Sequence, residues 1–168
     1  LRFNFRGVGR SQGVYDRGEG ELSDAASALD WLQNYNPDAP YCFIAGFSFG
    51  AWIGMQLLMR RPEITGFISI SPPANMYDFS FLAPCPASGL IVQGNADDIV
   101  PEESVSNLIA KIAKQRDVVI DYQVIQGATH FYGEHMDELE SRVETHLDAR
   151  LKELADRRPE APPDVEEV

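Results

Sequence analysis

Short apolar runs alternate along this chain with longer segments in which apolar residues recur every three or four positions. The short runs are rich in β-branched and aromatic residues, a composition typical of β-strands. Because helical periodicity separates most of these runs, the pattern predicts a parallel sheet whose strands are joined by right-handed crossover helices. The predicted strands cover residues 1–5, 41–46, 64–71, 88–94 and 118–126.

The segments between the predicted strands differ in how much of their surface is apolar. Residues 49–59 are apolar nearly all round, which predicts a helix buried against the sheet. Three other segments carry apolar residues on one face only, so they predict amphipathic helices, the last of them a long closing helix. Their apolar faces consist of Leu22, Ala25, Ala26, Leu29 and Leu32, of Val105, Leu108, Ile109 and Ile112, and of Met136, Leu139, Val143, Leu147, Leu151 and Leu154.

Together these elements predict one α/β domain over residues 1–156, with a mostly parallel sheet of about five strands and helices on both faces. The remaining residues, 157–168, contain three prolines and four acidic residues and almost nothing that a core could bury. We therefore expect this tail to be disordered.

The amino-acid composition limits which partners the protein can bind and where in the cell we expect it. Lys and Arg total 14 against 26 Asp and Glu, and a net charge of −12 disfavours binding to nucleic acid or to anionic membrane surfaces. Cys42 and Cys85 are the two cysteines, which is typical of reduced thiols rather than of a disulfide scaffold. No apolar stretch approaches a membrane span and no secretion signal is visible, so we expect a cytoplasmic protein; the oligomeric state stays open.

Ser48 stands between Gly46 and Gly50, directly after a predicted strand and directly before the buried helix. A strand that turns into a helix through one residue strains that residue and crowds the positions two before and two after it, and glycine removes the crowding Cβ atoms. We predict that this turn presents the Ser48 hydroxyl above the carboxyl edge of the sheet. The alternative is a tight glycine turn with a bystander serine.

A serine hydroxyl needs a base to activate it and an acid to orient that base. His130 follows the last predicted strand and can reach the carboxyl edge of the sheet, whereas His135 and His146 fall in the closing helix and are predicted at the surface. Asp97 and Asp98 follow the strand at residues 88–94, so either could orient His130. Turn formation and helix capping are the alternative roles for these two acids.

Four motifs resemble the α/β-hydrolase superfamily over about residues 1–150. They are "FNFRGVGRSQG", "GFSFGA", "GNADDIVP" and "GATHF", and they resemble the strand and turn before the first crossover helix, the nucleophile elbow, the acid motif and the histidine loop. The small uncapped, dienelactone-hydrolase-like proteins and small bacterial predicted hydrolases have the most similar pattern. The resemblance implies Ser48 as nucleophile, His130 as base, Asp97 rather than Asp98 as acid, and the backbone amide of Phe49 as one oxyanion donor.

The same resemblance implies that part of the family fold is not in this chain. The family sheet usually has about eight strands, of which the five predicted here resemble strands four to eight. The third family strand would lie between residues 1–5 and 41–46, and the loop after it normally supplies a second oxyanion donor. We therefore expect an amino-terminal truncation of about fifty or more residues, by analogy with the family's length, and reduced activity of the chain alone.

Aromatic residues near the motifs are candidates for a substrate pocket. Phe47 and Phe131 adjoin the elbow and the histidine, and Tyr77, Phe79 and Phe81 lie in the connection of residues 71–86. The latter three could line an acyl pocket or pack on the core. Because this connection is short, we expect an open site without a lid, suited to small or exposed acyl groups.

The resulting functional hypothesis is a serine hydrolase that acts on small carboxylic esters, with thioesters and lactones left open as substrates and with no cofactor or metal. "RGVGRSQG" superficially resembles a dinucleotide fingerprint, but Gln12 occupies the place of the third glycine. No histidine spacing typical of a metal site occurs. The alternatives are acyl transfer to an acceptor other than water, peptidase activity with the same residues, and a binding module of the same fold without catalysis.

Overall fold

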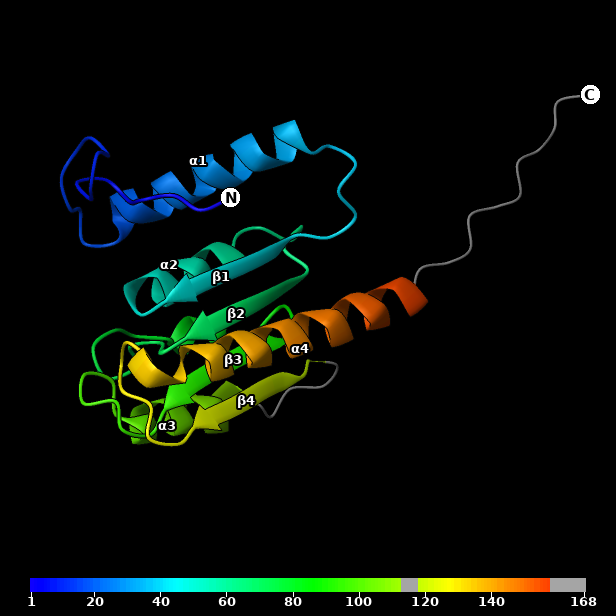
Figure 1. Cartoon of the computed structure of the whole chain (residues 1–168). Coiled ribbons are helices and arrows are strands. Elements are labelled where there is room, and N and C mark those ends of the chain that lie inside the picture. The colour runs from blue at the N-terminus through cyan, green and yellow to red at the C-terminus, as the bar shows by residue number, and fades with distance from the viewer. Residues whose placement is uncertain (113–117, 158–168) are drawn as a thin grey trace, which may run out of the picture.

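The computed structural model describes residues 1–112 and 118–157. Within these residues one sheet of four parallel strands runs in the spatial order β1-β2-β3-β4 (Figure 1). Each strand lies inside or within one residue of a predicted apolar run, and the predicted α/β class with a parallel sheet is confirmed. The strands are β1 (Phe43–Phe47), β2 (Gly66–Ile70), β3 (Gly89–Gly94) and β4 (Ile120–Ile125).

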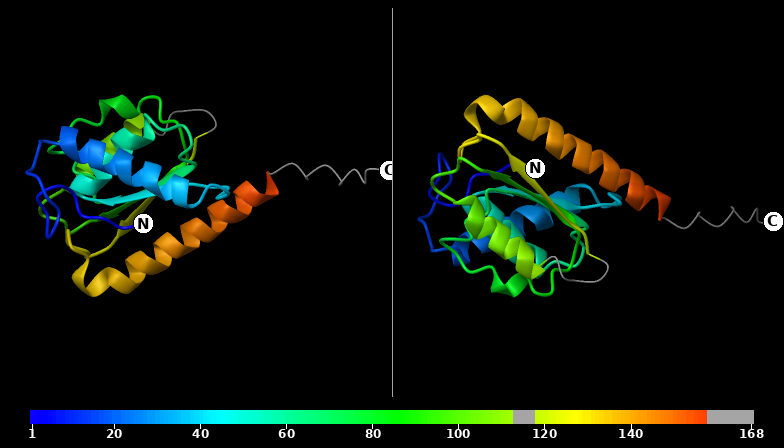
Figure 2. Two further views of the ribbon diagram at one scale, coloured as in Figure 1. Left: turned by 90° about the horizontal axis from the view of Figure 1, so that it is seen from above. Right: turned by 90° about the horizontal axis from the view of Figure 1, so that it is seen from below.

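Helices cover both faces of the sheet, as predicted. α1, α2 and α3 lie on one face and α4 lies on the other (Figure 2). Two short 3-10 helices, η1 (Ser80–Leu82) and η2 (Gly133–His135), interrupt the loops after β2 and β4. The α-helices are α1 (Glu19–Tyr35), α2 (Phe49–Leu58), α3 (Glu102–Ile112) and α4 (Met136–Asp156).

The sheet separates two apolar cores of different size. The larger core joins α1, α2 and α3 to one face of the sheet, and the apolar sequence of α2 fits its burial there because Ile53, Leu57 and Leu58 are at most 2% exposed. The smaller core joins α4 to the other face through Leu139. The apolar stripe predicted for the closing helix is therefore buried only in part, and Leu151 is exposed.

Residues 1–5 form no strand, which corrects the expectation of a fifth strand. They lie on the open side of the edge strand β1 but do not pair with it, since a hollow lined by both segments separates them (Figure 1). Leu1 and Phe3 remain exposed. An apolar β-forming sequence becomes a strand only where an adjacent strand takes up its backbone hydrogen bonds, and β1 is too far away to do so.

The tail expected to be disordered covers residues 157–168. Residues 158–168 lie outside the described residues, so the disorder stays a prediction.

No helix in residues 1–112 and 118–157 combines the length and apolarity needed to cross a membrane.

Candidate active site

Ser48 is the single residue that joins β1 to α2. Its backbone has φ 50° and ψ −120°, in the positive-φ region that side-chain-bearing residues rarely adopt. The Ser48 amide donates to the carbonyl of Ile70 at 2.8 Å, which ties the turn to β2. The side chain thus stands at the amino end of a buried helix, as the sequence predicts for this turn.

The two glycines that flank Ser48 differ in how much room each has for a Cβ atom. A Cβ atom on Gly46 would lie 2.3 Å from the carbonyl oxygen of Gly50, so glycine is required at position 46. A Cβ atom on Gly50 would meet only Phe5, at an ordinary 4.0 Å. The expectation that both positions are crowded is therefore wrong for Gly50, because its carbonyl, and not its Cα, faces Gly46.

Three predicted side chains from three strand ends meet in one row of contacts. The Nε2 atom of His130 lies 3.1 Å from the Ser48 hydroxyl, and its Nδ1 atom lies 2.8 Å from Oδ2 of Asp97. His130 and Asp97 are both buried, whereas Asp98 is exposed. We call Ser48, His130 and Asp97 the Ser–His–Asp row.

Asp97 is held as an ionised carboxylate. Its Oδ1 atom accepts hydrogen bonds from the amides of Ile99, at 3.0 Å, and Val100, at 2.7 Å. Burial alone raises the pKa of Asp97, but the Val100 amide, His130 and the Ile99 amide together bring the pKa below its ordinary value. The carboxylate therefore stays charged at neutral pH and accepts a hydrogen bond from Nδ1–H of His130.

Sequence analysis missed Gln93, which also contacts the row. Gln93 is fully buried on β3 and donates from Nε2 to Oδ2 of Asp97 at 3.1 Å. The signal available in the sequence was one polar residue inside the otherwise apolar run "GLIVQG". An amide side chain on a buried strand cannot bond to water, so it needs a partner within the protein.

The loop that carries His130 is anchored in the core by Tyr132. Tyr132 has φ 56° and is almost completely buried, and its hydroxyl donates to the carbonyl of Val92 at 3.2 Å and lies 3.0 Å from the Ser71 hydroxyl. Burial raises the pKa of Tyr132 to about 12, so the phenol keeps its proton. These contacts fix the loop after β4 to the ends of β2 and β3.

The backbone amide of Phe49 is the first of α2. Amides in the first turn of a helix have no intrahelical acceptor, and the helix dipole makes this end favourable for negative charge. The geometry suits the predicted oxyanion donor, whose role stays a prediction.

The aromatic pocket candidates fall into two groups. Phe47 and Phe131 flank His130, with ring centroids 5.0 and 5.1 Å from the imidazole, and both are exposed. Tyr77 stacks on Trp52 and touches the ring of Phe49. The remaining candidates pack away from the row: Phe79 is buried in the larger core, and Phe81 stacks on it.

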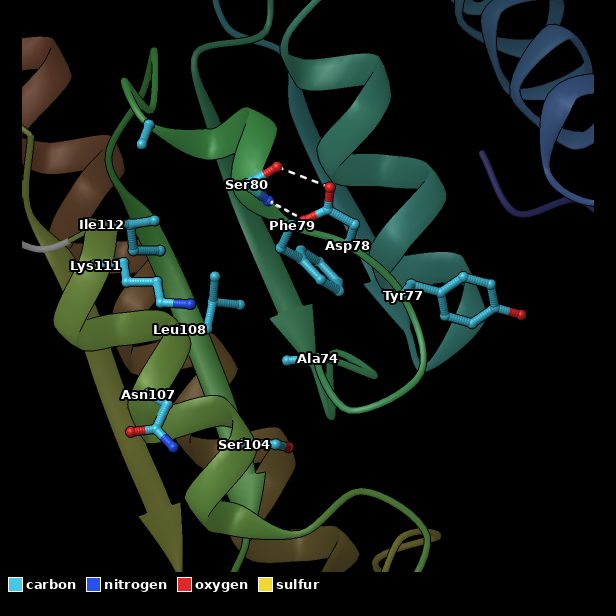
Figure 3. A pocket seen from close by; sticks show the side chains of 11 residues that line it. Ala74, Tyr77, Asp78, Phe79, Ser80, Ser104, Asn107, Leu108, Lys111 and Ile112 are labelled. Carbon is cyan, nitrogen blue, oxygen red and sulfur yellow. Dashed lines mark hydrogen bonds between the residues drawn. The ribbon is translucent and has the colours of Figure 1, made fainter.

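A cavity of about 560 Å³ lies between α3 and the loop after β2 (Figure 3). Tyr77 and Phe79 line it, but no member of the Ser–His–Asp row does, and neither does Phe81. Of the two alternatives for Phe79 and Phe81, an acyl pocket at Ser48 or packing on the core, the structure shows the second, because both side chains pack in or against the larger core.

The expectation that His146 lies at the surface is wrong. His146 is buried, and its Nδ1 atom lies 3.0 Å from Oδ2 of Asp121 on β4. His135 is partly exposed, as predicted, but it lies in η2 and not in the closing helix. Across residues 1–112 and 118–157, no three His, Cys, Asp or Glu side chains converge in an arrangement that could hold a metal ion.

Two comparisons with known proteins identify the family. Residues 1–94, more than half of the chain, match the family model described as X-Pro dipeptidyl-peptidase (S15 family). The chain is 59% identical to a protein of unknown function from Agrobacterium tumefaciens whose crystal structure is described as a putative alpha/beta hydrolase, with a TM-score of 0.88 over 90% of this chain and 69% of that one. The chain belongs to the α/β-hydrolase superfamily.

Other relatives of this α/β-hydrolase chain agree with that assignment. A crystal structure from Xanthomonas campestris, described as an α/β serine hydrolase without a lid, is 31% identical, with a TM-score of 0.79 over 88% of this chain and 65% of that one. An uncharacterized protein of Rickettsia prowazekii is 53% identical over 151 residues, 88% of this chain. The α/β-hydrolase chain spans 63% of the length of the Rickettsia protein.

Proposed function

We propose that this α/β-hydrolase chain belongs to a serine hydrolase that cleaves carboxylic esters, with the Ser–His–Asp row as its catalytic triad. The observation that carries the proposal is the unbroken row of contacts, 3.1 Å from Ser48 to His130 and 2.8 Å from His130 to Asp97. These are the distances at which a base takes a proton from a nucleophile and an acid orients the base.

The reaction begins when Oγ of Ser48 attacks the ester carbonyl carbon and its proton passes to Nε2 of His130. The backbone amide of Phe49 donates to the carbonyl oxygen as that oxygen becomes negative. Collapse of the tetrahedral intermediate breaks the bond to the alcohol, which leaves with the proton from His130. Water then attacks the acyl-serine, gives its proton to His130, and releases the acid while Ser48 regains its hydrogen.

Asp97 acts through His130. Its charge stabilises the imidazolium that forms when His130 takes the serine proton, and its contact with Nδ1 keeps the unprotonated Nε2 atom facing Ser48 in the resting state. The low pKa of Asp97 supports this role because a protonated carboxyl group would stabilise the imidazolium far less.

The open surroundings of the row support small or exposed acyl groups as substrates. Phe47 and Phe131 leave apolar rings exposed beside His130, where they could contact an acyl or alkoxy group. The connection between β2 and β3 contains η1 but no α-helix that could form a lid over this edge. The printed description of the Xanthomonas relative, a serine hydrolase without a lid, supports the same expectation.

Peptidase activity is a second candidate because residues 1–94 match the S15 family model. That stretch includes Ser48 but ends before Asp97 and His130. The same acyl-enzyme chemistry would cleave a peptide bond, with an amine in place of the alcohol as leaving group. Under this candidate the substrate would be a peptide with proline in its second position.

The test uses a fluorophosphonate probe together with substrate panels on the full chain and on Ser48→Ala. We expect the probe to label the wild type and not Ser48→Ala, and p-nitrophenyl esters of short acyl chains to be turned over faster than Ala-Pro-p-nitroanilide. Ser27→Ala, an exposed serine on α1, is the matched control and should label like the wild type.

Three other results would point to a different function or a different nucleophile. A folded wild type that the probe does not label supports a binding module without catalysis. Faster release of p-nitroaniline than of p-nitrophenol supports the peptidase, and labelling that persists in Ser48→Ala contradicts the assignment of the nucleophile.

A further inference from the structure

Four N–H groups surround the carboxylate of Asp97. The two backbone amides of Ile99 and Val100 point at Oδ1, whereas His130 and Gln93 share Oδ2. A carboxylate oxygen accepts more than one hydrogen bond, so the two side chains compete for the negative charge of the same atom. Gln93 therefore contacts the one oxygen on which the orientation of His130 depends.

The amide of Gln93 can face this site in only one orientation. Its Nε2 atom lies 3.1 Å from Oδ2 of Asp97, 2.8 Å from the carbonyl of Val100 and 3.2 Å from the carbonyl of Gly94. All three neighbours are acceptors, so an oxygen in the place of Nε2 would be repelled by each of them. The NH₂ group is thereby fixed toward Asp97.

In this orientation the oxygen of the Gln93 amide has no hydrogen-bond donor among the described residues. The Oε1 atom of Gln93 is buried and has no hydrogen-bond partner among residues 1–112 and 118–157. A buried acceptor without a donor destabilises the folded state. Methionine, of similar length, would remove that oxygen from the core of β3, but it would also remove the donor to Asp97.

We propose that Gln93 is a positioning residue of the active site, which holds Oδ2 of Asp97 against His130 and limits the negative charge that this oxygen presents to the imidazole. The inference rests on the proposed function, because it needs His130 to act as the base. Gln93 does not touch the substrate; it acts through Asp97.

A methionine at position 93 separates this role from a structural one. Without the Gln93 donor, Oδ2 of Asp97 keeps its full charge for His130, which stabilises the protonated imidazole. The acid limb of the pH–kcat/KM profile should then move to higher pH by about half a unit, and kcat should fall about tenfold because the acid is less well fixed. KM should change less than about twofold, since no substrate contact is lost.

Few other titratable groups adjoin the pair and could produce such a shift. From the loop after β4, Tyr132 faces Asp97 with a phenol that stays protonated in this pH range. From the loop after β3, Asp98 is exposed beside Asp97. No described residue other than Asp97 forms an ion pair with His130. Neither neighbour changes in the Gln93 variants.

Gln93→Glu provides a second variant of the same shape. The introduced carboxyl group can still donate to Asp97 while it is protonated, whereas its ionised form repels Asp97, so the loss of turnover should grow as pH rises from about 6 to 9. Gln126→Glu is the matched control, since Gln126 is exposed after β4 and accepts a hydrogen bond from Asn95 without contact to the row. Its profile should match that of the wild type.

The experiment measures kcat, KM and thermal unfolding of the full chain over about pH 5–9, with fluorophosphonate labelling of Ser48 as a separate readout. A shifted acid limb in Gln93→Met supports the inference at any unfolding midpoint at which the variant is folded, because a purely structural role would not move the profile. A lowered midpoint with an unshifted profile overturns it in favour of a structural role.

If Gln93→Met does not fold, the pH-dependent loss in Gln93→Glu decides in the same way, and its absence overturns the inference. Labelling of the wild type with unshifted Gln93 variants contradicts the role of Gln93 while the proposed function stands. A folded wild type without labelling contradicts both.

Discussion

The same contact occurs at two places in the molecule, between His130 and Asp97 at the carboxyl edge of the sheet and between His146 and Asp121 under α4. In both, Nδ1 of a buried histidine lies close to Oδ2 of an aspartate, at 2.8 Å in the first pair and 3.0 Å in the second. By distance and histidine burial alone, the two pairs are nearly the same.

They differ in what surrounds the contact. The Nε2 atom of His130 faces the Ser48 hydroxyl, whereas that of His146 is buried with no partner among the described residues. The side chain of Asp97 is fully buried, but that of Asp121 is 38% exposed. A histidine and an aspartate therefore make a candidate base only where a nucleophile meets the second ring nitrogen and the acid is held away from water.

The largest effect should come from removing the charge of each acid in turn. Asp97→Asn should lower kcat by about 10⁴-fold, because the amide can donate to Nδ1 and favour the tautomer with its proton facing Ser48. Asp121→Asn should leave kcat within about twofold, since His146 contacts no nucleophile among the described residues. Steady-state kinetics with a p-nitrophenyl ester measures both.

Equal losses in the two variants would contradict this distinction between the two pairs, because they would mean that His146 and Asp121 also serve the reaction. A small loss in Asp97→Asn alone would show that His130 keeps its orientation without this acid.

The next effect concerns how Ser48 is brought to His130. Gly46→Ala should destabilise the fold by about 3 kcal/mol, because its methyl group would overlap the carbonyl oxygen of Gly50. Gly50→Ala should change the free energy of unfolding by less than about 1 kcal/mol, since that position has room and lies in a helix. Urea denaturation measures the two variants, and equal destabilisation would contradict the one-sided crowding at the turn.

The smallest effect is the pH dependence contributed by Asp97. Its pKa lies below the ordinary value near 4, so the ionised carboxylate stabilises the fold above that value and the contribution is lost as pH falls through the folded-state pKa. The stability difference between the wild type and Asp97→Asn should therefore shrink between about pH 5 and pH 2. Urea denaturation at several pH values measures it, and a constant difference would contradict the lowered pKa.

Most of the fold could be predicted from periodicity because strands and helices here have clear patterns. The error at residues 1–5 shows the limit of periodicity. This run has the composition of a strand, but a strand also needs an adjacent strand to pair with, and the local sequence does not show whether one is present. His146 was misplaced for a related reason. A polar residue on a helix suggests solvent, and only the position of β4 reveals Asp121 facing it.

Position after strand ends predicted Ser48, His130 and one of two acids, and the resemblance to the α/β-hydrolase acid motif favoured Asp97 over Asp98. The supporting residues were harder to predict. Gln93 looked like one polar residue in an apolar strand, and its contact with Asp97 depends on how the loop after β3 folds back. The difference between Gly46 and Gly50 likewise depends on which backbone atoms face each other, which no residue type encodes.

The strand order ties the geometry of the Ser–His–Asp row to the whole sheet. Ser48 and His130 are 82 residues apart in sequence and follow β1 and β4, the two outer strands of the described sheet. Their contact therefore requires that β2 and β3 lie correctly between these strands. A chain whose sheet is incomplete between β1 and β4 could not hold the Ser48 hydroxyl at Nε2 of His130.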